Sequence, residues 1–280
     1  MYKYLLALFL LVNSTTGNAQ GSLMKSNTEN LVIGEKVQLF SKVLEEKRDL
    51  NIYLPQGYSK DSLKTYPVIY LLDGSMDEDF LHIAGLVQFG SFSWINMLPE
   101  SIVVGIGNVD RKKDFTYPTN NKKDLEDFPT TGHSSDFIRF IEEELQAYIE
   151  RNYRHTSTKT IIGQSLGGLL ATEILFKKPE LFDNYIIVSP SLWWDDESLL
   201  KQNPKEGSSV KNIYVGVGKE GPIMERTAKE LYEKLDSAAS GNKAVYFNFL
   251  EAQDHGDALH LAVYDAFNKI FSSENPKYED

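Results

Sequence analysis

The sequence of 280 residues contains no cysteine, and its acidic residues outnumber its basic ones. The absence of cysteine excludes disulfide bonds, thiolate nucleophiles and cysteine-bound metals. The 29 Lys and Arg residues and the 40 Asp and Glu residues leave a formal net charge of −11. Because proteins that bind nucleic acids present a basic surface, this charge argues against a nucleic-acid partner.

Long apolar runs are also scarce, and the run at the N-terminus is too short to span a membrane. It covers residues 4–12, whereas a transmembrane helix needs about 20 apolar residues. Lys3 precedes this run, and a segment of small and polar residues ending at Ala19 follows it. This is the arrangement of a secretory signal. We therefore expect a signal peptide over residues 1–19, cleaved after Ala19, and a periplasmic or secreted protein.

The rest of the sequence predicts a linker over residues 20–34 and a single domain over residues 35–280. Apolar runs typical of strands cover residues 37–43, 51–54, 66–74, 101–108, 158–165, 184–190, 212–218 and 243–251. Amphipathic helical patterns cover residues 136–153, 166–177, 224–238 and 258–271. Strands that alternate with helices predict a mostly parallel sheet of about eight strands, covered on both faces. No helix separates the first two strands, so the sheet should begin with an antiparallel hairpin.

A serine between glycines stands where one of these strands meets a helix. The segment G-Q-S-L-G covers residues 163–167 and follows an apolar run. G-x-S-x-G in this context is typical of the nucleophile elbow of α/β-hydrolases, in which the glycines permit a cramped turn and the serine hydroxyl is exposed. Ser165 is therefore the candidate nucleophile. The alternative is a glycine-rich turn whose serine only caps the helix.

A serine nucleophile needs a base, and chain order selects one of the five histidines. In α/β-hydrolases the histidine follows the last strand. Three of the histidines precede the serine, and His260 lies inside the final helical pattern. His255 comes directly after the last predicted strand, and we predict that it is the base.

The candidate acid is Glu220, just after the strand predicted at residues 212–218, where the acid of a triad belongs. A Ser–His pair without an acid is left open. Residues 216–221 also match G-x-G-x-x-G, the pattern of a dinucleotide-binding turn. Pro222 follows the last glycine, and no acidic residue ends the next strand at the expected offset of roughly 20 residues. We therefore expect no organic cofactor.

Two backbone N–H groups are candidates for an oxyanion hole. Leu166 begins the helix after the nucleophile, where N–H groups and the helix dipole favour negative charge. Ser75 follows the Asp-Gly pair that ends the strand predicted at residues 66–74, and its N–H can face the elbow. The N–H of Gly74 is the alternative.

Three side chains near the same edge of the sheet are candidates for substrate binding. Trp193 and Trp194 follow the strand predicted at residues 184–190 and could stack on a sugar or an aromatic acyl group. Packing of one of them in the core is the alternative. Arg111 lies in a long polar loop at residues 108–123, near the end of the strand predicted at residues 101–108, and could meet an anionic substrate. The acidic segment at residues 73–79 lacks the spacing of a calcium loop, so no metal site is expected.

Three segments carry a resemblance to a known family: YLLDGS at residues 70–75, the stretch from GQSLGG to SPSLWWDD at residues 163–196, and DHG at residues 254–256. They resemble the "Putative esterase" family of α/β-hydrolases, in the branch similar to enterobactin- and bacillibactin-type siderophore esterases. The resemblance covers nearly all of residues 35–272. It implies an α/β-hydrolase fold and places the nucleophile on Ser165 and the base on His255. It also implies oxyanion donors at Leu166 and Ser75 and an acid near Glu220.

The sequence thus predicts a serine esterase that cleaves a small-molecule carboxylic ester through an acyl-enzyme, without a metal or cofactor. A siderophore ester and a carbohydrate-linked ester are both compatible with the residues. Two alternatives stay open. The protein could pass the acyl group to a sugar, or it could bind ligands on a hydrolase scaffold without catalysis.

Overall fold

The computed structural model describes residues 27–205, 209–239 and 243–271. The chain divides into two units, Met1–Val32 and Ile33–Asp280. The described residues of the first unit, 27–32, have no regular secondary structure. The predicted signal peptide, residues 1–19, lies outside the described residues. Within the described ranges, no helix has both the length and the apolar character needed to cross a membrane.

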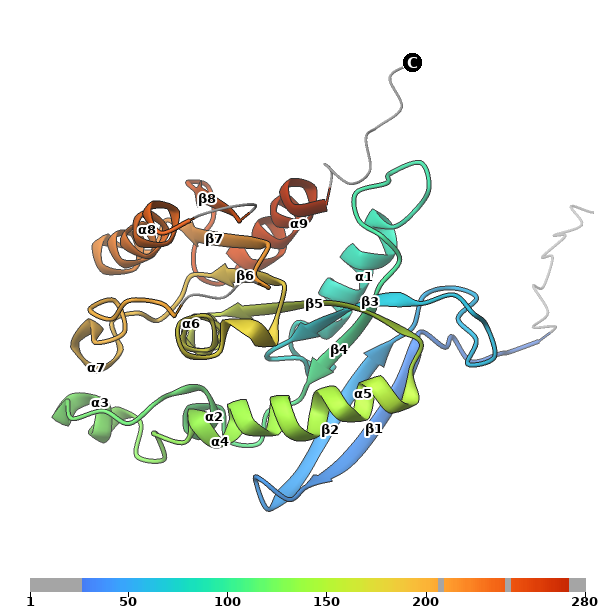
Figure 1. Cartoon of the computed structure of the whole chain (residues 1–280), viewed down its shortest axis with the longest axis horizontal. Coiled ribbons are helices and arrows are strands. Elements are labelled where there is room, and N and C mark those ends of the chain that lie inside the picture. The colour runs from blue at the N-terminus through green and yellow to red at the C-terminus, as the bar shows by residue number, and fades with distance from the viewer. Residues whose placement is uncertain (1–26, 206–208, 240–242, 272–280) are drawn as a thin grey trace, which may run out of the picture. The chain divides into compact units, whose positions relative to one another are not determined.

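The second unit is built on a sheet of eight strands. The strands are β1 (Gly34–Ser41), β2 (Glu46–Tyr53), β3 (Tyr66–Leu71), β4 (Ile102–Ile106), β5 (His155–Gln164), β6 (Asn184–Val188), β7 (Asn212–Gly218) and β8 (Ala244–Leu250). Their spatial order is β1-β2-β4-β3-β5-β6-β7-β8 (Figure 1). β2 runs antiparallel to both β1 and β4, and the other neighbouring pairs are parallel. The predicted hairpin at the start of a mostly parallel sheet is confirmed.

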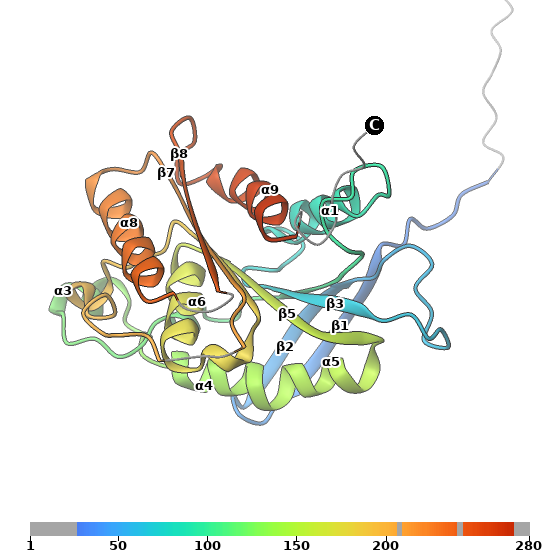
Figure 2. The same cartoon turned by 45° about the horizontal axis from the view of Figure 1, so that its top comes forward.

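Helices cover both faces of this sheet. They are α1 (Phe80–Gly90), α2 (Arg111–Phe115), α3 (Lys122–Asp127), α4 (Ser134–Arg139), α5 (Gln146–Asn152), α6 (Leu166–Lys177), α7 (Trp194–Glu197), α8 (Pro222–Ser237) and α9 (Ala258–Phe271). A π-helical turn, Phe140–Leu145, joins α4 to α5, and a short 3-10 turn, Pro179–Leu181, follows α6. α1 and α9 pack on one face, and α4, α5, α6 and α8 pack on the other. Figure 2 shows α1 and α9 side by side, with α4 across the sheet.

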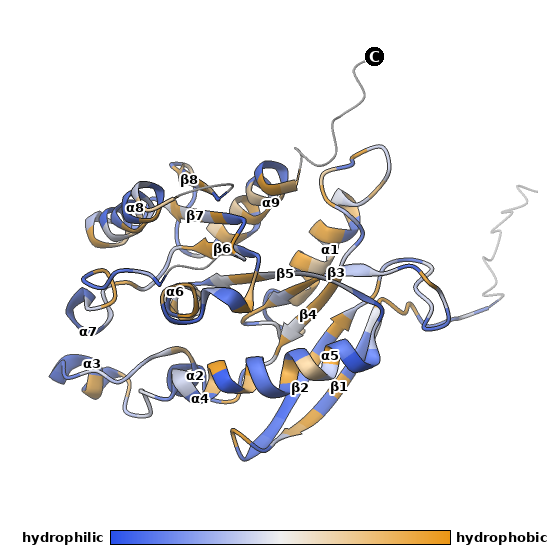
Figure 3. Cartoon of the chain, viewed as in Figure 1, coloured by the Kyte–Doolittle hydropathy of each residue, from blue (hydrophilic) through white to orange (hydrophobic). Residues whose placement is uncertain are grey.

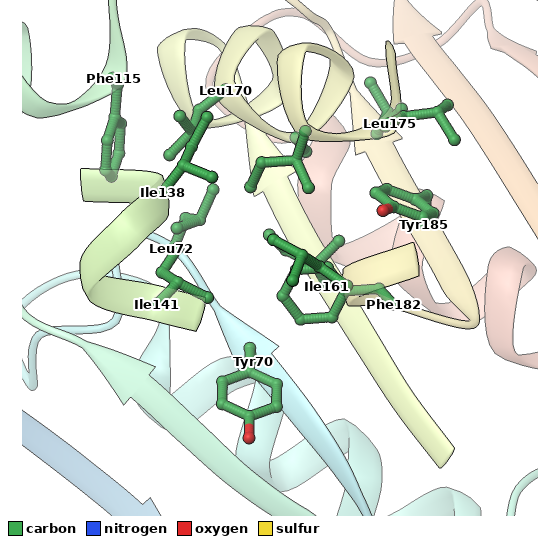
Figure 4. Packing of buried hydrophobic residues seen from close by; sticks show 14 of the residues in the cluster. Tyr70, Leu72, Phe115, Ile138, Ile141, Ile161, Leu170, Leu175, Phe182 and Tyr185 are labelled. Carbon is green, nitrogen blue, oxygen red and sulfur yellow. The ribbon is translucent and has the colours of Figure 1, made fainter. Parts of the chain in front are cut away.

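The strands divide their side chains between two cores, because successive residues of a strand point to opposite faces. Tyr70 of β3 faces the core under α5 and α6, whereas its neighbour Leu71 faces the core under α1 and α9. Figure 4 shows Ile161 of β5 beside Phe182, below the helix that carries Leu170. All of these side chains are buried. The sheet is therefore covered on both faces, as the apolar runs of its strands predicted.

The predicted polar loop after β4 contains two short helices that the sequence patterns did not reveal. The carboxylate of Asp110 accepts a hydrogen bond from the N–H of Lys113 (3.0 Å) and caps α2. The side-chain oxygen of Asn121 accepts one from the N–H of Lys123 (2.9 Å) and caps α3. Helices of five and six residues are too short for an apolar period to show, so only the capping residues indicated them.

Replacing Ile161 by alanine tests the packing of the central strand. Ile161 is fully buried, so the substitution leaves a cavity, and we expect the free energy of unfolding to fall by about 2 to 5 kcal/mol. Urea denaturation measures the loss. The control is Leu63→Ala, because Leu63 is 94% exposed and its loss should change the free energy by less than about 0.5 kcal/mol. Equal effects of the two substitutions would contradict this packing.

Candidate active site

Ser165 sits in a strained turn between the end of β5 and the start of α6. Its φ of 59° and ψ of −120° are a conformation that a residue with a side chain adopts at a cost of order 1 to 3 kcal/mol. The turn brings strand and helix so close that a Cβ atom on Gly163 would lie 2.4 Å from the carbonyl oxygen of Gly167. Only glycine fits at position 163, which explains the first glycine of the G-x-S-x-G pattern.

His255 and Glu220 meet across the ends of two neighbouring strands. His255 lies on the loop after β8, Glu220 lies just after β7, and Nδ1 of His255 is 2.5 Å from Oε2 of Glu220. A carboxylate beside Nδ1 fixes the proton on that nitrogen and leaves Nε2 able to accept a proton. The carbonyl oxygen of His255 accepts a hydrogen bond from the side chain of Gln164 (2.7 Å). This hydrogen bond connects the loop that carries His255 to Gln164, the residue before Ser165.

The carboxylate of Glu220 is held by three hydrogen-bond donors. Besides His255, the hydroxyl of Ser189 and the backbone N–H of Gly218 (2.9 Å) donate to Oε1. The side chain of Glu220 is 2% exposed and that of His255 is 48% exposed. Burial alone would raise the pKa of Glu220, but the hydrogen bonds outweigh it, first that from His255, and lower the pKa below its ordinary value. Glu220 is therefore ionised and oriented at neutral pH.

These residues surround a hollow of about 650 Å³. It is lined by Ser165, Ser191, Trp193, Lys219, Glu220, Met224, Asp254 and His255. The three predicted catalytic residues are thus brought together from the ends of β5, β7 and β8. The hydroxyl of Ser165 lies 3.4 Å from that of Ser191, and within the described residues no hydrogen bond joins it to His255. Catalytic hydrogen bonds often form fully only when substrate is bound.

The two predicted oxyanion donors differ in their surroundings. Leu166 is the first residue of α6, where backbone N–H groups have no partner within the helix. The N–H of Ser75 instead donates to the carboxylate of Glu78 (3.2 Å), and its role as an oxyanion donor stays a prediction. The alternative, Gly74, donates its N–H to the carbonyl oxygen of Ile106 (2.9 Å), the last residue of β4. The N–H of Ser75 can donate to an oxyanion only when its hydrogen bond to Glu78 is broken.

Two of the predicted substrate contacts need correction. Trp194 is fully buried, and its Nε1–H donates to the carbonyl oxygen of Tyr117 (2.9 Å), so it is a core residue, whereas Trp193 lines the hollow. Arg111 is engaged with Asp73 through two hydrogen bonds, from Nε (2.6 Å) and Nη2 (2.8 Å). Its guanidinium therefore holds the segment just after β3 and is not free to bind an anionic substrate.

Four residues that line the hollow were not predicted as site residues: Ser191, Lys219, Met224 and Asp254. Lys219 and Met224 flank the predicted acid in the sequence, and Ser191 lies two residues before Trp193. Proximity to predicted site residues was the only signal for them. Among the described residues, no three His, Asp or Glu side chains are arranged to hold a metal ion.

Asp79, at the start of α1, provides a pH-dependent test of the loop between β3 and α1. Burial, together with the nearby Asp73 and Glu78, raises the pKa of Asp79 to about 6. In the unfolded chain Asp79 ionises near pH 4, so the folded state loses stability as the pH rises from about 4 to 6. Asp79→Asn removes this cost. Above pH 6 we expect a gain of about 1 kcal/mol, less than the full pKa shift implies because solvent screens a half-buried group.

Urea denaturation at pH 4 and at pH 7.5 measures this gain, which should nearly vanish at the lower pH. Asp77→Asn is the matched control, because Asp77 lies exposed in the same loop. An equal gain at both pH values would show that Asp79 is not ionised at a cost in the folded protein.

Comparisons with known proteins find esterases among the relatives of this chain. The family described as "Putative esterase" matches residues 41–272. The chain is 30% identical to the ferri-bacillibactin esterase BesA of Bacillus subtilis over 285 residues, which cover 94% of this chain and 97% of BesA. It is 29% identical to a siderophore enterobactin esterase of Emericella nidulans over 121 residues, or 39% of this chain and 40% of the relative.

Solved structures give the same result for the fold. An IroE-like serine hydrolase from Shewanella oneidensis superposes with a TM-score of 0.75 and 28% identity, covering 85% of this chain and 80% of the other. The BES protein from Bacillus cereus also has a TM-score of 0.75 and 28% identity, and the match covers 89% of this chain and 98% of the BES protein. With these relatives and with the mostly parallel sheet described above, the fold is that of the α/β-hydrolases. The chain is an ester hydrolase and belongs to the "Putative esterase" family.

Proposed function

We propose that the protein hydrolyses a siderophore ester by an acyl-enzyme mechanism in which Ser165, His255 and Glu220 act as nucleophile, base and acid. The observation that carries this proposal is the 2.5 Å contact between His255 and Glu220 in a hollow that Ser165 also lines. A buried carboxylate on Nδ1 of a histidine stabilises the imidazolium that forms when Nε2 takes up a proton.

In the first half of the reaction, the Ser165 oxygen bonds to the ester carbonyl carbon while its proton passes to Nε2 of His255. The carbonyl oxygen becomes an oxyanion facing the N–H of Leu166, at the positive end of the α6 dipole. The ester C–O bond then breaks, and the alcohol leaves with the proton from His255. Ser75 adds a second donor if the approaching oxyanion displaces Glu78 from its N–H.

In the second half, water attacks the acyl carbon and gives a proton to His255. The bond between that carbon and the serine oxygen breaks, and Ser165 takes the proton back as the carboxylic acid leaves. His255 is neutral again at the end of each half, so the proton transfers balance without a redox partner or a metal. Glu220 keeps its negative charge throughout and only orients and stabilises the histidine.

A fluorophosphonate probe tests the nucleophile directly. The probe should label Ser165, identified by mass spectrometry, and Ser165→Ala should abolish labelling and ester turnover. His255→Ala should lower kcat by about 10² to 10⁴-fold, because the proton then has no positioned acceptor. Ser191→Ala is the matched control, since it removes the neighbouring hydroxyl in the same hollow and should leave labelling at Ser165. Labelling of Ser191, or full turnover by Ser165→Ala, contradicts the mechanism.

Two features support the siderophore part of the proposal. The relatives include proteins described as esterases of ferri-bacillibactin and of enterobactin. Trp193 and Met224 give the hollow apolar walls, and its charged lining consists of Lys219, Asp254 and Glu220 beside His255. An aromatic wall suits a substrate that carries aromatic rings.

Hydrolysis of ferri-bacillibactin, followed by chromatography, tests the substrate, with a feruloyl sugar ester as the competing class. We expect cleavage of the siderophore, and Trp193→Ala should raise its KM by about 2- to 12-fold, the value of one aromatic contact of about 0.5 to 1.5 kcal/mol. Trp94→Ala is the matched control, because Trp94 lies outside this hollow. Cleavage of the sugar ester alone would move the substrate class to carbohydrate-linked esters and leave the serine mechanism intact.

A further inference from the structure

The loop that carries His255 has little apolar packing of its own. It follows β8, which is the last strand of the sheet and pairs with β7. α8 packs on these two strands, and Figure 3 shows its hydrophilic side turned outward. Residues 251–257 form the loop, and all of them are exposed except the partly buried Gln253. Because so little of the loop is buried, its position depends on hydrogen bonds.

Beyond the flanking β8 and α9, three hydrogen bonds connect this loop to the rest of the described chain. The carbonyl oxygen of Gln253 accepts one from the N–H of Lys219 (2.7 Å), and Nδ1 of His255 lies 2.5 Å from the carboxylate of Glu220. Both of these partners follow β7. The third bond comes from Nε2 of Gln164, which donates to the carbonyl oxygen of His255 (2.7 Å). This third bond reaches β5, the strand that leads to the nucleophile.

Gln164 is a well-fixed anchor for this bond. It is the last residue of β5, a central strand, and it pairs with Val188 of β6. Its own carbonyl oxygen accepts a hydrogen bond from Nη2 of Arg111 (3.3 Å), and Arg111 is held by the carboxylate of Asp73. The residue after Gln164 is Ser165. One side chain therefore links the residue before the nucleophile to the backbone of the base.

Ser165 and His255 do not fix their own separation. They line one hollow, and among the described residues no hydrogen bond joins their side chains. Proton transfer needs the two heavy atoms within about 2.6 to 3.2 Å of each other, and a displacement of about 1 Å can lower a rate about 100-fold. We propose that Gln164 is a positioning residue that holds His255 within reach of Ser165. This inference rests on the proposed roles of the serine and the histidine.

Two substitutions remove this hydrogen bond in different ways. Gln164→Met keeps the length of the side chain without the donor, and Gln164→Asn keeps the amide on a chain one methylene shorter. Both should lower kcat for p-nitrophenyl butyrate by about 10- to 100-fold, because the base is then misplaced. KM should change by less than about 2-fold, since Gln164 is not among the described residues that line the hollow. The melting temperature should fall by at most about 4 °C, the effect of one lost hydrogen bond.

Proton NMR distinguishes positioning of the histidine from a general loss of structure. The Nδ1 proton of His255, held against Glu220, should give a far-downfield resonance that His255→Ala removes. In both Gln164 variants this resonance should weaken, because an imidazole that moves away from the carboxylate exchanges this proton with water. Gln88→Met is the matched control, since Gln88 is exposed on α1, and it should keep the wild-type kcat and resonance.

Active sites are counted by complete reaction with a fluorophosphonate, so that kcat refers to folded enzyme only. A wild-type kcat, or an undiminished resonance, in both Gln164 variants overturns the proposal. So does a higher KM at unchanged kcat, which would make Gln164 a substrate contact. Turnover by Ser165→Ala would instead reject the proposed mechanism, whereas labelling of Ser165 at wild-type kcat in the Gln164 variants rejects only the positioning role.

Discussion

The close approach of β5 and α6 at Gly163 and Gly167 is the constraint on which the site depends. Because strand and helix nearly touch there, the chain can turn only by forcing Ser165 into a conformation that is costly for a residue with a side chain. The surrounding core holds it, since α6 is buried along almost its whole length between the sheet and its neighbours. The strain at one residue is therefore offset by the packing of the eleven buried residues of α6, and the turn leaves the serine side chain on the lining of the hollow.

Similar strain marks the neighbouring strand ends. Asp73 after β3 and Ser189 after β6 also have positive φ, 54° and 44°, and each uses its side chain in the polar framework of the site. Asp73 pairs with Arg111, whose Nη2 also reaches the carbonyl oxygen of Gln164 (3.3 Å). Ser189 donates to Glu220. The carboxyl ends of adjacent parallel strands thus form one hydrogen-bonded layer beneath the hollow, as expected for the ligand-binding edge of an α/β sheet.

Two carboxylates near this layer have pKa values shifted in opposite directions. Glu220 has three donors, and its pKa is lowered, so it is a fixed negative charge for His255. Asp79, close to Asp73 and Glu78, has its pKa raised to about 6. The loop between β3 and α1 therefore concentrates negative charge where an oxyanion donor is needed, and Glu78 occupies the N–H of Ser75. Arg111 is the cation that balances this cluster.

The sequence by itself determined the strand order along the chain, the hairpin at its start, the elbow at Ser165 and the position of His255, because apolar periods, glycines and chain order are local signals. It also indicated Glu220, although only the fold could bring its carboxylate to 2.5 Å from the imidazole. Tertiary structure alone decided that Trp194 is core while Trp193 lines the hollow, that Arg111 pairs with Asp73, and that His82 of α1 stacks on His260 of α9. These outcomes depend on contacts between residues far apart in the chain, which no local pattern encodes.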